Sequence, residues 1–344
     1  MTTMATKPAS PPYALLRAGF PYYTTLGMRR VTTYCMDIVI GEEDLLYVLC
    51  RADSPGLGGS NIRRTNWDDE DLDTLGGGKL LWPVQMIRDR DGNLYVSDEG
   101  NHRIYRFKTD GTDLGEWGEE GSHEGQFNRP SGIAFDADEN LWVVDTLNHR
   151  VQKFTKDGAY LGGFGSHGNG PGEFDMPWGV TVTGEGDILV ADWHNDRVQK
   201  LNADGEFIME FGSSGDGDGE FHRPAGVEVD QHGDIYVADR GNNRIQQFAP
   251  DGRYVDKFIG DATLSKSGQT YVRANPAVLR NREMANTEQQ KRFRGPASVR
   301  FDDQDRMYVP DFGCHRIQVY KKEAYPLTPE EIFPVPDHPT LYTV

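Results

Sequence analysis

The sequence predicts an all-β protein: a six-bladed β-propeller with four-stranded antiparallel blades and a partly helical insertion between blades five and six. Three marks repeat along the chain in the same order. They are a proline, a short apolar block that ends in aspartate, and an arginine five residues after that aspartate. Because independent marks stay in register over more than 200 residues, they indicate a structural repeat rather than a chance resemblance.

The spacing of these marks defines the blades. Successive repeat aspartates are 47, 47, 47 and 72 residues apart, and the prolines and arginines keep the same intervals. The aspartates are Asp98, Asp145, Asp192, Asp239 and Asp311; the arginines are Arg103, Arg150, Arg197, Arg244 and Arg316; the prolines are Pro83, Pro130, Pro177, Pro224 and Pro296. The last interval exceeds the others by 25 residues, which locates an insertion between Ile259 and Phe293.

Each repeat has the pattern of four short strands. In blade three the segments 132–135, 141–144, 150–154 and 160–164 are rich in β-branched and aromatic residues and are separated by Gly, Asn and Asp turns. Four-stranded sheets repeated at this period close into a ring, which leaves only short, protected sheet edges. An open solenoid would need polar caps, and the sequence shows none.

A sixth, degenerate repeat precedes the other five. Its block Leu46–Cys50 ends 48 residues before Asp98, with Cys35 in place of the proline and Cys50 in place of the aspartate. Since proline and aspartate stand at adjoining strand ends, the two cysteines are expected to be neighbours. We interpret them as packed thiols, with a redox or metal-binding pair as the alternative.

We expect the whole chain, residues 1–344, to form one propeller domain. Its expected parts are an N-terminal segment 1–30 with a ring-closing strand at 22–27, the degenerate blade one at 31–80, blades two to five at about 81–258, the insertion at 259–293, blade six at 294–320, and a C-terminal strap at 321–344. Asn275-Pro276 suits a helix start. The insertion is either a lid over the channel mouth or a surface excursion that the loop tolerates.

The pattern Pro-x-Gly-[Ile/Val]…[Leu/Ile]-[Tyr/Trp]-Val-x-Asp-x-x-Asn-x-Arg-[Ile/Val] resembles the NHL-repeat family over about residues 30 to 320. The resemblance implies a propeller, but that family includes lyases, hydrolase-like proteins and interaction scaffolds. The fold is also similar to that of peptidyl-α-hydroxyglycine amidating lyases, which bind zinc through histidines that follow such prolines. Here those six positions hold Met36, Val84, Ser131, Trp178, Ala225 and Ala297. The zinc site therefore does not carry over.

Net charge, apolar segments and cysteine content indicate which binding partners and which cellular compartment to expect. The 54 acidic and 36 basic residues give a formal charge of -18, and the densest basic stretch, Arg280–Arg294, also contains acidic residues. An acidic surface repels phosphate backbones, so we expect no nucleic-acid partner. No segment has the roughly 20 apolar residues of a membrane span, and residues 1–12 contain no apolar run of secretory length. With three cysteines, the expectation is a cytoplasmic protein that binds no membrane.

Two repeated features are interpreted as structural. Each repeat aspartate and its arginine lie at adjoining strand ends, where a charge-assisted hydrogen bond can hold the turn. His102, His149 and His315 share one repeat position, which suggests a three-histidine metal site. Asp196 and Asn243 replace them in the other blades, and each histidine precedes an arginine that would repel a cation. A polar turn is therefore the favoured interpretation.

Residues that differ between blades at positions facing one channel mouth are the candidates for function. We predict a pocket whose acid–base residues are His194, Glu99 and Asp37, and whose ligand-binding residues are Arg51, Arg240, Trp178, Trp193, Gln85, Ser298 and Phe312. An aromatic wall opposite a few polar groups is typical of a small-molecule site. The alternative is that the tryptophans plug the mouth and the charges are solvated. Glu228 and Arg300 are expected to form an ion pair that lines the channel.

Each candidate has a chemical reason. His194 can transfer protons near neutral pH, with Asp37 or Glu99 as its orienting partner, as a base or as a cation ligand. Arg51 or Arg240 can hold a carboxylate or stabilise an oxyanion. The leading hypothesis is a lyase- or hydrolase-like propeller that acts on a small polar or carboxylate-bearing molecule. The rival is a non-catalytic scaffold with a protein or peptide partner. No cofactor is predicted, and a divalent cation, Ca²⁺ or Zn²⁺, is the alternative.

Overall fold

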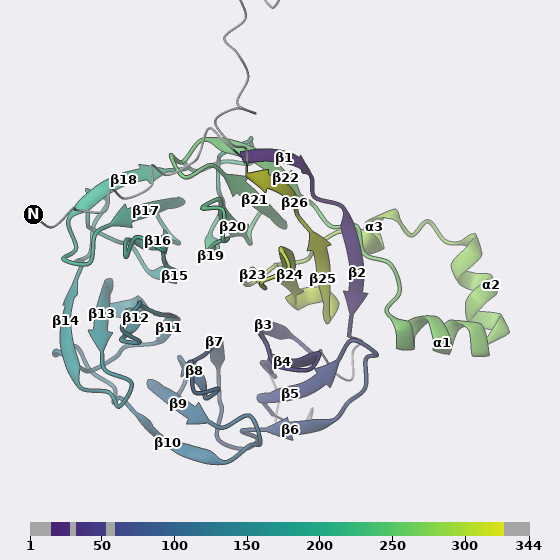
Figure 1. Cartoon of the computed structure of the whole chain (residues 1–344), viewed down its shortest axis with the longest axis horizontal. Helices are drawn as coiled ribbons and strands as arrows, with labels where there is room; N and C mark the ends of the chain where they lie inside the picture. The colour runs from purple at the N-terminus through teal and green to yellow at the C-terminus, as the bar shows by residue number, and fades with distance from the viewer. Residues whose placement is uncertain (1–14, 28–31, 53–58, 327–344) are drawn as a thin grey trace, which may run out of the picture.

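The computed structural model describes residues 15–27, 32–52 and 59–326, and these form six four-stranded antiparallel sheets arranged in a ring (Figure 1). Blade one is β3 (Cys35–Ile40), β4 (Leu45–Cys50), β5 (Asn61–Asn66) and β6 (Asp73–Leu75); blade two is β7 (Pro83–Arg88), β8 (Leu94–Asp98), β9 (Arg103–Phe107) and β10 (Asp113–Trp117). Blade three is β11 (Pro130–Phe135), β12 (Leu141–Asp145), β13 (Arg150–Phe154) and β14 (Tyr160–Phe164).

Blade four is β15 (Pro177–Val182), β16 (Ile188–Asp192), β17 (Arg197–Leu201) and β18 (Phe207–Phe211); blade five is β19 (Pro224–Val229), β20 (Ile235–Asp239), β21 (Arg244–Phe248) and β22 (Tyr254–Phe258). Blade six combines both ends of the chain, in the order β23 (Arg300–Phe301), β24 (Arg306–Asp311), β25 (Arg316–Lys321) and β2 (Tyr22–Leu26). In every blade the first strand lies nearest the axis and the last lies at the rim (Figure 1). The six-bladed fold is therefore the one that the repeat predicts.

The N-terminal segment completes blade six. β2 pairs antiparallel with β25, with Leu26 opposite Ile317 and Thr25 opposite Gln318. Next to it, β1 (Leu15–Gly19) pairs with β26 (Glu323–Pro326) in a separate two-stranded sheet. The outermost strand expected at 22–27 is thus supplied by β2. Of the expected C-terminal strap, residues 327–344 lie outside the described residues, as do residues 1–14 of the N-terminal segment.

The repeat aspartates and arginines hold the turn after the second strand. In blade three, Asp145 stands opposite Arg150, and its Oδ2 accepts a hydrogen bond from Arg150 Nε at 2.8 Å. Blades four, five and six repeat this bond at 3.0, 2.7 and 2.9 Å. Blade two differs, because Arg103 pairs with Glu116 at 3.1 Å, while Asp98 accepts four backbone N–H groups. The expected pair is therefore found in four blades.

A second repeated contact joins neighbouring blades. The residue before each repeat arginine has a left-handed backbone, and its side chain accepts a hydrogen bond from a backbone N–H at the start of the next blade. The acceptors are His102, His149 and His315 through Nδ1, and Asp196 and Asn243 through Oδ1. The position needs a short acceptor that tolerates positive φ, which Asp, Asn and His provide. This contact is called the inter-blade latch below.

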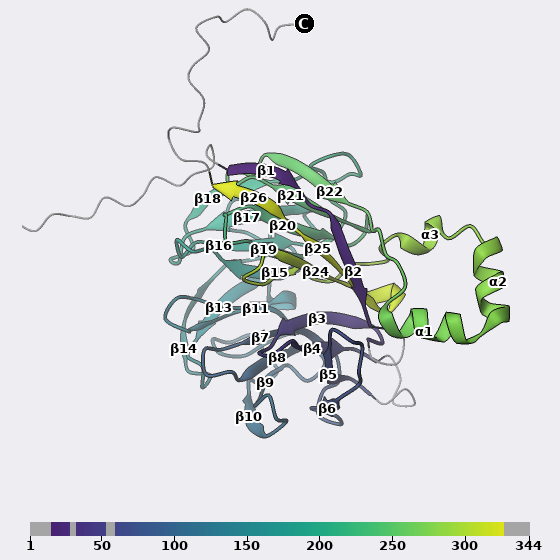
Figure 2. The same cartoon turned by 45° about the vertical axis from the view of Figure 1, so that its right-hand side comes forward.

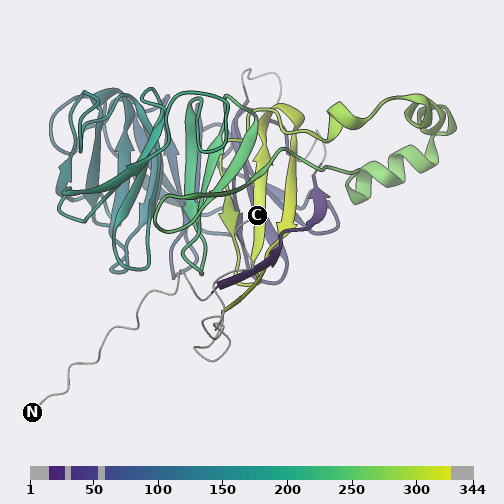
Figure 3. The same cartoon turned by 90° about the horizontal axis from the view of Figure 1, so that it is seen from above.

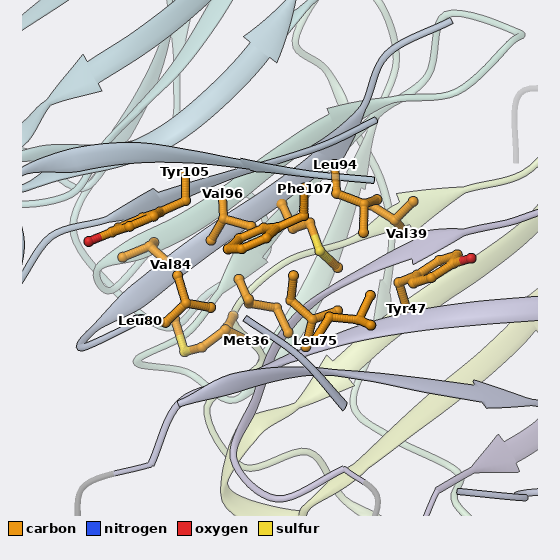
Figure 4. Close-up of a cluster of buried hydrophobic side chains, with 14 residues drawn as sticks. Met36, Val39, Tyr47, Leu75, Leu80, Val84, Leu94, Val96, Tyr105 and Phe107 are labelled. Carbon is orange, nitrogen blue, oxygen red and sulfur yellow. The ribbon is translucent and has the colours of Figure 1, made fainter. Parts of the chain in front are cut away.

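Apolar residues on facing sheets fill the space between blades. Figure 4 shows one such cluster, in which Met36, Val39 and Tyr47 from blade one meet side chains of blade two. The blade-two side chains labelled there include Val84, Leu94, Val96, Tyr105 and Phe107. Burying both faces of every sheet in this way is what favours closure of the ring.

The inner strands do not approach one another equally closely. A Cβ atom on Gly132, Gly179 or Gly226 would meet the backbone of the next blade at 2.5, 2.3 and 2.9 Å. Blades one, two and six place Asp37, Gln85 and Ser298 at the same repeat position. Glycine is therefore needed where neighbouring inner strands touch, and larger polar side chains fill the wider gaps.

The insertion forms three helices, α1 (Lys266–Ala274), α2 (Pro276–Met284) and α3 (Glu288–Lys291). They extend from the side of the ring and away from its axis (Figures 1 and 3). The turned view in Figure 2 shows the same lateral projection. The helices do not cover the channel mouth, so the lid alternative does not describe this structure. Nowhere in the described ranges does a helix combine the length and apolar character needed to cross a membrane.

Candidate functional site

Six residues, one from each blade, stand at one end of the ring, which is called the upper mouth here. They follow the second strand of each blade, at the end where the innermost strands begin. These six residues, called the mouth ring, are Arg51, Glu99, Thr146, Trp193, Arg240 and Phe312. Because a propeller brings the same repeat position of every blade around one axis, their differences give the mouth its chemical character.

Arg51 and Glu99 form an ion pair across blades one and two. Arg51 Nη2 lies 2.6 Å from Glu99 Oε1, and the Glu99 side chain is only 4% exposed. The Arg51 guanidinium also lies over the Trp82 ring, 5.6 Å from its centroid. Trp82 and Arg51 together hold the carboxylate of Glu99 in a fixed position at the mouth.

Arg240 is the second arginine of the mouth ring. Its guanidinium stacks over Phe312, 5.1 Å from the ring centroid. Burial lowers the pKa of Arg240, the positive charge of Arg51 lowers it further, and Glu99 raises it. Among the described residues we find no hydrogen bond or ion pair to the Arg240 guanidinium. The half-buried Arg240 guanidinium thus lies near the Arg51 guanidinium and forms no ion pair with a carboxylate of the described residues.

Trp178 closes the channel below the mouth ring. It packs against the buried cluster that contains Met36, Val84 and Ala297, and its ring centroid lies 5.4 Å from that of Trp193. The channel beneath it narrows to a cavity of ≈ 10 Å³, about the space of one water molecule. A ligand at this end therefore has to bind above Trp178.

Asp37, Gln85 and Ser298 lie below that level and are bound to protein groups. Gln85 Oε1 accepts the Ile133 N–H at 3.0 Å. Asp37 is fully buried, and its carboxylate accepts the Met86 N–H at 2.9 Å and the Ser298 hydroxyl at 2.8 Å. All three side chains bridge neighbouring inner strands.

Arg300 crosses the channel beneath them. Its Nε donates to Asp37 at 2.9 Å, its Nη2 also contacts Asp37, and its Nη1 donates to Glu228 at 2.7 Å. The expected Glu228–Arg300 ion pair is confirmed, and Asp37 joins it. Burial opposes the charge on Arg300, but the two carboxylates outweigh burial and raise its pKa. Sequence reasoning missed the Asp37–Arg300 contact because their repeat positions differ by two residues.

The opposite end of the channel holds a larger cavity. It has a volume of ≈ 480 Å³, and Arg300 and Glu228 lie among its lining residues with Arg88 and Asp302. Arg300 therefore separates the narrow upper channel from this lower cavity. No sequence signal pointed to it, because its apolar walls come from ordinary inner-strand residues such as Ile40 and Ile87.

His194 lies beside the mouth and belongs to a group of imidazoles around Asp175. Its ring stacks on Trp193 at 4.9 Å, and its Nδ1 lies 3.4 Å from Asp175 Oδ2. His149 and His167 approach the other carboxylate oxygen at 3.5 and 3.6 Å. The structure thus pairs His194 with Asp175, and not with Asp37 or Glu99.

His149, His167 and Asp175 are close enough to hold a metal ion, since their ligand atoms lie within 4.8 Å of one another. However, Nδ1 of His149 accepts the Met176 N–H at 3.1 Å, which is the inter-blade latch of this blade. A metal at that nitrogen would have to break the latch. The donor set therefore fits a cation poorly while the latch is formed.

Cys35 and Cys50 are neighbours, as the degenerate repeat predicts. They stand opposite each other on β3 and β4, and both are buried. Burial raises the pKa of the Cys50 thiol to about 12 and raises that of Cys35 as well. Both thiols are protonated near neutral pH, which suits a packing role.

The structure thus brings together Arg51, Glu99, Arg240, Phe312, Trp178 and Trp193. Sequence reasoning overlooked two arginines at the rim. Arg129 lies over Trp82 at 5.5 Å and Arg223 lies over Trp193 at 5.1 Å. Both directly precede a repeat proline, and that shared position is the signal that could have revealed them.

Comparison with known proteins supports the fold. The NHL repeat model matches residues 127–154, 174–201 and 221–248, and a comparison with curated proteins gives no match. A solved structure of unknown function from Bacteroides thetaiotaomicron VPI-5482 is 20% identical with a TM-score of 0.61, over 89% of this chain and 76% of that one.

Two further structures carry functional names. A virginiamycin B lyase from Staphylococcus aureus is 13% identical with a TM-score of 0.53, over 88% of this chain and 99% of that one. A putative gluconolactonase is 15% identical with a TM-score of 0.56, over 92% and 94%. At these identities the likeness concerns the fold alone. With the repeat motifs, the six closed sheets and the matched repeat model, the chain is a six-bladed β-propeller that contains NHL repeats.

Proposed function

We propose that the protein binds a small carboxylate-bearing molecule at the upper mouth, above Trp178. The observation that carries this proposal is the Arg240 guanidinium, which is half-buried beside Arg51 and has no carboxylate partner within the described ranges. Desolvating a cation next to another cation is unfavourable unless an anion compensates for it. A ligand carboxylate between the two arginines would provide that compensation.

The charge around the mouth supports an anionic ligand. Arg51, Arg240, Arg129 and Arg223 all lie on aromatic rings at this end, whereas Glu99 is the acidic member of the mouth ring. The protein as a whole has a formal charge of -18. A locally basic mouth on an acidic protein directs small anions to that mouth.

Lyase- or hydrolase-type chemistry would use Glu99 as the proton acceptor. Its carboxylate is held by Arg51 at 2.6 Å, and in this proposal it takes a proton from a ligand bound by Arg240. Arg240 would then stabilise the negative charge that develops. His194 is the second acid–base candidate, since its ring stacks on Trp193 at the edge of the mouth.

Binding of a carboxylate panel tests this proposal. Malonate, succinate, citrate and gluconate are titrated by calorimetry and by thermal shift against wild type, Arg240→Gln and Arg253→Gln. Arg253 is exposed on the blade-five turn at the opposite face, so it controls for the loss of one positive charge. We expect Arg240→Gln to weaken binding about 10- to 100-fold, as for the loss of a charge-assisted hydrogen bond. Equal affinity of wild type and Arg240→Gln would refute the proposal.

Glu99→Gln separates binding from catalysis. The variant keeps the shape of the side chain and removes the base, so a bound carboxylate that turns over in wild type should still bind and no longer react. Retained turnover in Glu99→Gln would exclude Glu99 as the base and leave the binding proposal standing.

A second candidate is a non-catalytic scaffold that binds an acidic peptide. Trp178 is compatible with it, because a closed channel keeps any ligand at the surface of the mouth, where an extended chain can bind as well as a small molecule. The same calorimetry with acidic peptides distinguishes the two. Tight binding of peptides, with no binding of free carboxylates, would identify the scaffold.

A further inference from the structure

The helical insertion is anchored at its base to the propeller. The Ser267 N–H and hydroxyl donate to Asp69 Oδ2 at 3.1 and 2.9 Å, and the Asp261 N–H donates to Gln318 at 2.9 Å. Ser265 caps the start of α1 by accepting the Gly268 N–H. The start of the insertion is therefore hydrogen-bonded to residues of blades one and six, and these bonds fix the point at which the insertion leaves the ring.

The far end of the insertion has almost no packing of its own. Neither α2 nor α3 buries a single residue, and α1 buries only Val272. Met284 is 78% exposed and Tyr271 is 57% exposed. Helices of fewer than about 12 residues are marginal in water and depend on packing for stability. The nine residues of α2 therefore need a surface to pack on, which this chain does not provide within its described residues.

The charge of the insertion differs in sign from that of the rest of the chain. Residues 259–293 contain six basic and three acidic residues, a formal charge of +3. The whole chain has 36 basic and 54 acidic residues, which leaves 30 and 51, or -21, for everything outside the insertion. The insertion is thus complementary in charge to the propeller that carries it, yet it projects away from that propeller (Figures 1 and 3).

We propose that the insertion is a dimerisation arm that packs on the acidic propeller of a second copy of this chain. In a two-fold dimer the arm of each copy packs on the propeller of the other copy. The same contact therefore occurs twice and buries α2 of both copies. Tyr271 and Met284 supply the apolar contacts, and the arginines of α2 face the acidic surface. A hollow of ≈ 380 Å³ between α1 and α2, lined by Leu264, Val272 and Leu279, accepts a side chain of the partner.

The oligomeric state of the full chain tests this proposal. Light scattering coupled to size exclusion, and sedimentation velocity from about 1 to 100 µM, are applied to wild type, Met284→Glu and Ile208→Glu. Ile208 is 46% exposed on the outer strand of blade four, so it is a matched control away from the arm. We expect a dimer for wild type and Ile208→Glu, and at least a tenfold weaker dimer for Met284→Glu.

Two further readouts keep the outcome decisive. Higher salt should weaken the dimer, because the contact joins opposite charges. Hydrogen exchange of the α2 amides should slow as protein concentration rises, because packing on the partner stabilises the helix. Circular dichroism checks that each variant is folded. A wild-type monomer at 100 µM, or a dimer that Met284→Glu leaves intact, overturns the proposal.

Discussion

Replacing Gly179 by alanine tests how closely the inner strands of blades four and five approach each other. The added Cβ would lie 2.3 Å from the Ala225 carbonyl oxygen, whereas real Cβ atoms essentially never come within 3.0 Å of a heavy atom outside their own residue and its chain neighbours. One strand must therefore move by at least 0.7 Å. The contact is with backbone, so no side-chain rotation relieves it.

The ring makes this displacement costly. Each inner strand is packed between two neighbours, and blade six is closed by β2, so a shift at one blade strains the others. Overpacking of this kind costs about 1–3 kcal/mol. By the usual conversion, the midpoint of thermal unfolding should fall by about 2–4 °C for each kcal/mol.

Urea unfolding followed by tryptophan fluorescence measures the change in the free energy of unfolding. Gly184→Ala is the matched control, because a Cβ at Gly184 meets nothing within 4 Å and lies on the same blade. Alanine there should be neutral or slightly stabilising. If Gly179→Ala and Gly184→Ala are equally stable, the inner strands do not approach each other as closely as we describe. The steric reason for glycine at this repeat position would then be wrong as well.

Three more predictions follow from buried contacts. Burial and the neighbouring His167 lower the pKa of His149, so the folded protein holds fewer protons than the unfolded chain and stability falls as pH drops below about 6.5. His149→Asn keeps a latch acceptor and should flatten this pH dependence in thermal melts. Arg300→Met leaves Asp37 buried without its cation and should cost about 3–5 kcal/mol in urea unfolding. Deleting residues 1–27 removes β2 from blade six, leaves β25 as an open edge, and should lower the thermal midpoint and promote aggregation.

Each of these has a result that would contradict it. An unchanged slope of stability against pH in His149→Asn would show that this imidazole does not link protonation to folding. A loss below about 1 kcal/mol for Arg300→Met would mean that water or another group compensates Asp37. A deletion variant that stays monomeric and melts like wild type would show that β2 contributes little to ring closure.

The sequence alone determined the ring and its structural repeats. The interval of 47 residues between aspartates is visible in the sequence because each blade has the same local requirement. At two adjoining strand ends, backbone N–H and C=O groups need hydrogen-bond partners, and the same residue types supply them. For the same reason the pairing of Asp145 with Arg150 and the closeness of Cys35 and Cys50 followed from repeat position. Local requirements recur in sequence, so they can be recognised there.

Only the tertiary structure decided how the residues that break the repeat are used. Asp37 and Gln85 are predicted as pocket residues, but in the structure their side chains bridge inner strands, because the distance between blades is a property of the closed ring. Trp178 closes the channel because the closed ring brings it against inner-strand residues of other blades. His194 pairs with Asp175 of its own blade. Arg240 is different, because its burial beside Arg51 arises from chain segments far apart in sequence. Contacts between distant segments leave no periodic trace in the sequence, and the ring has to close before they exist.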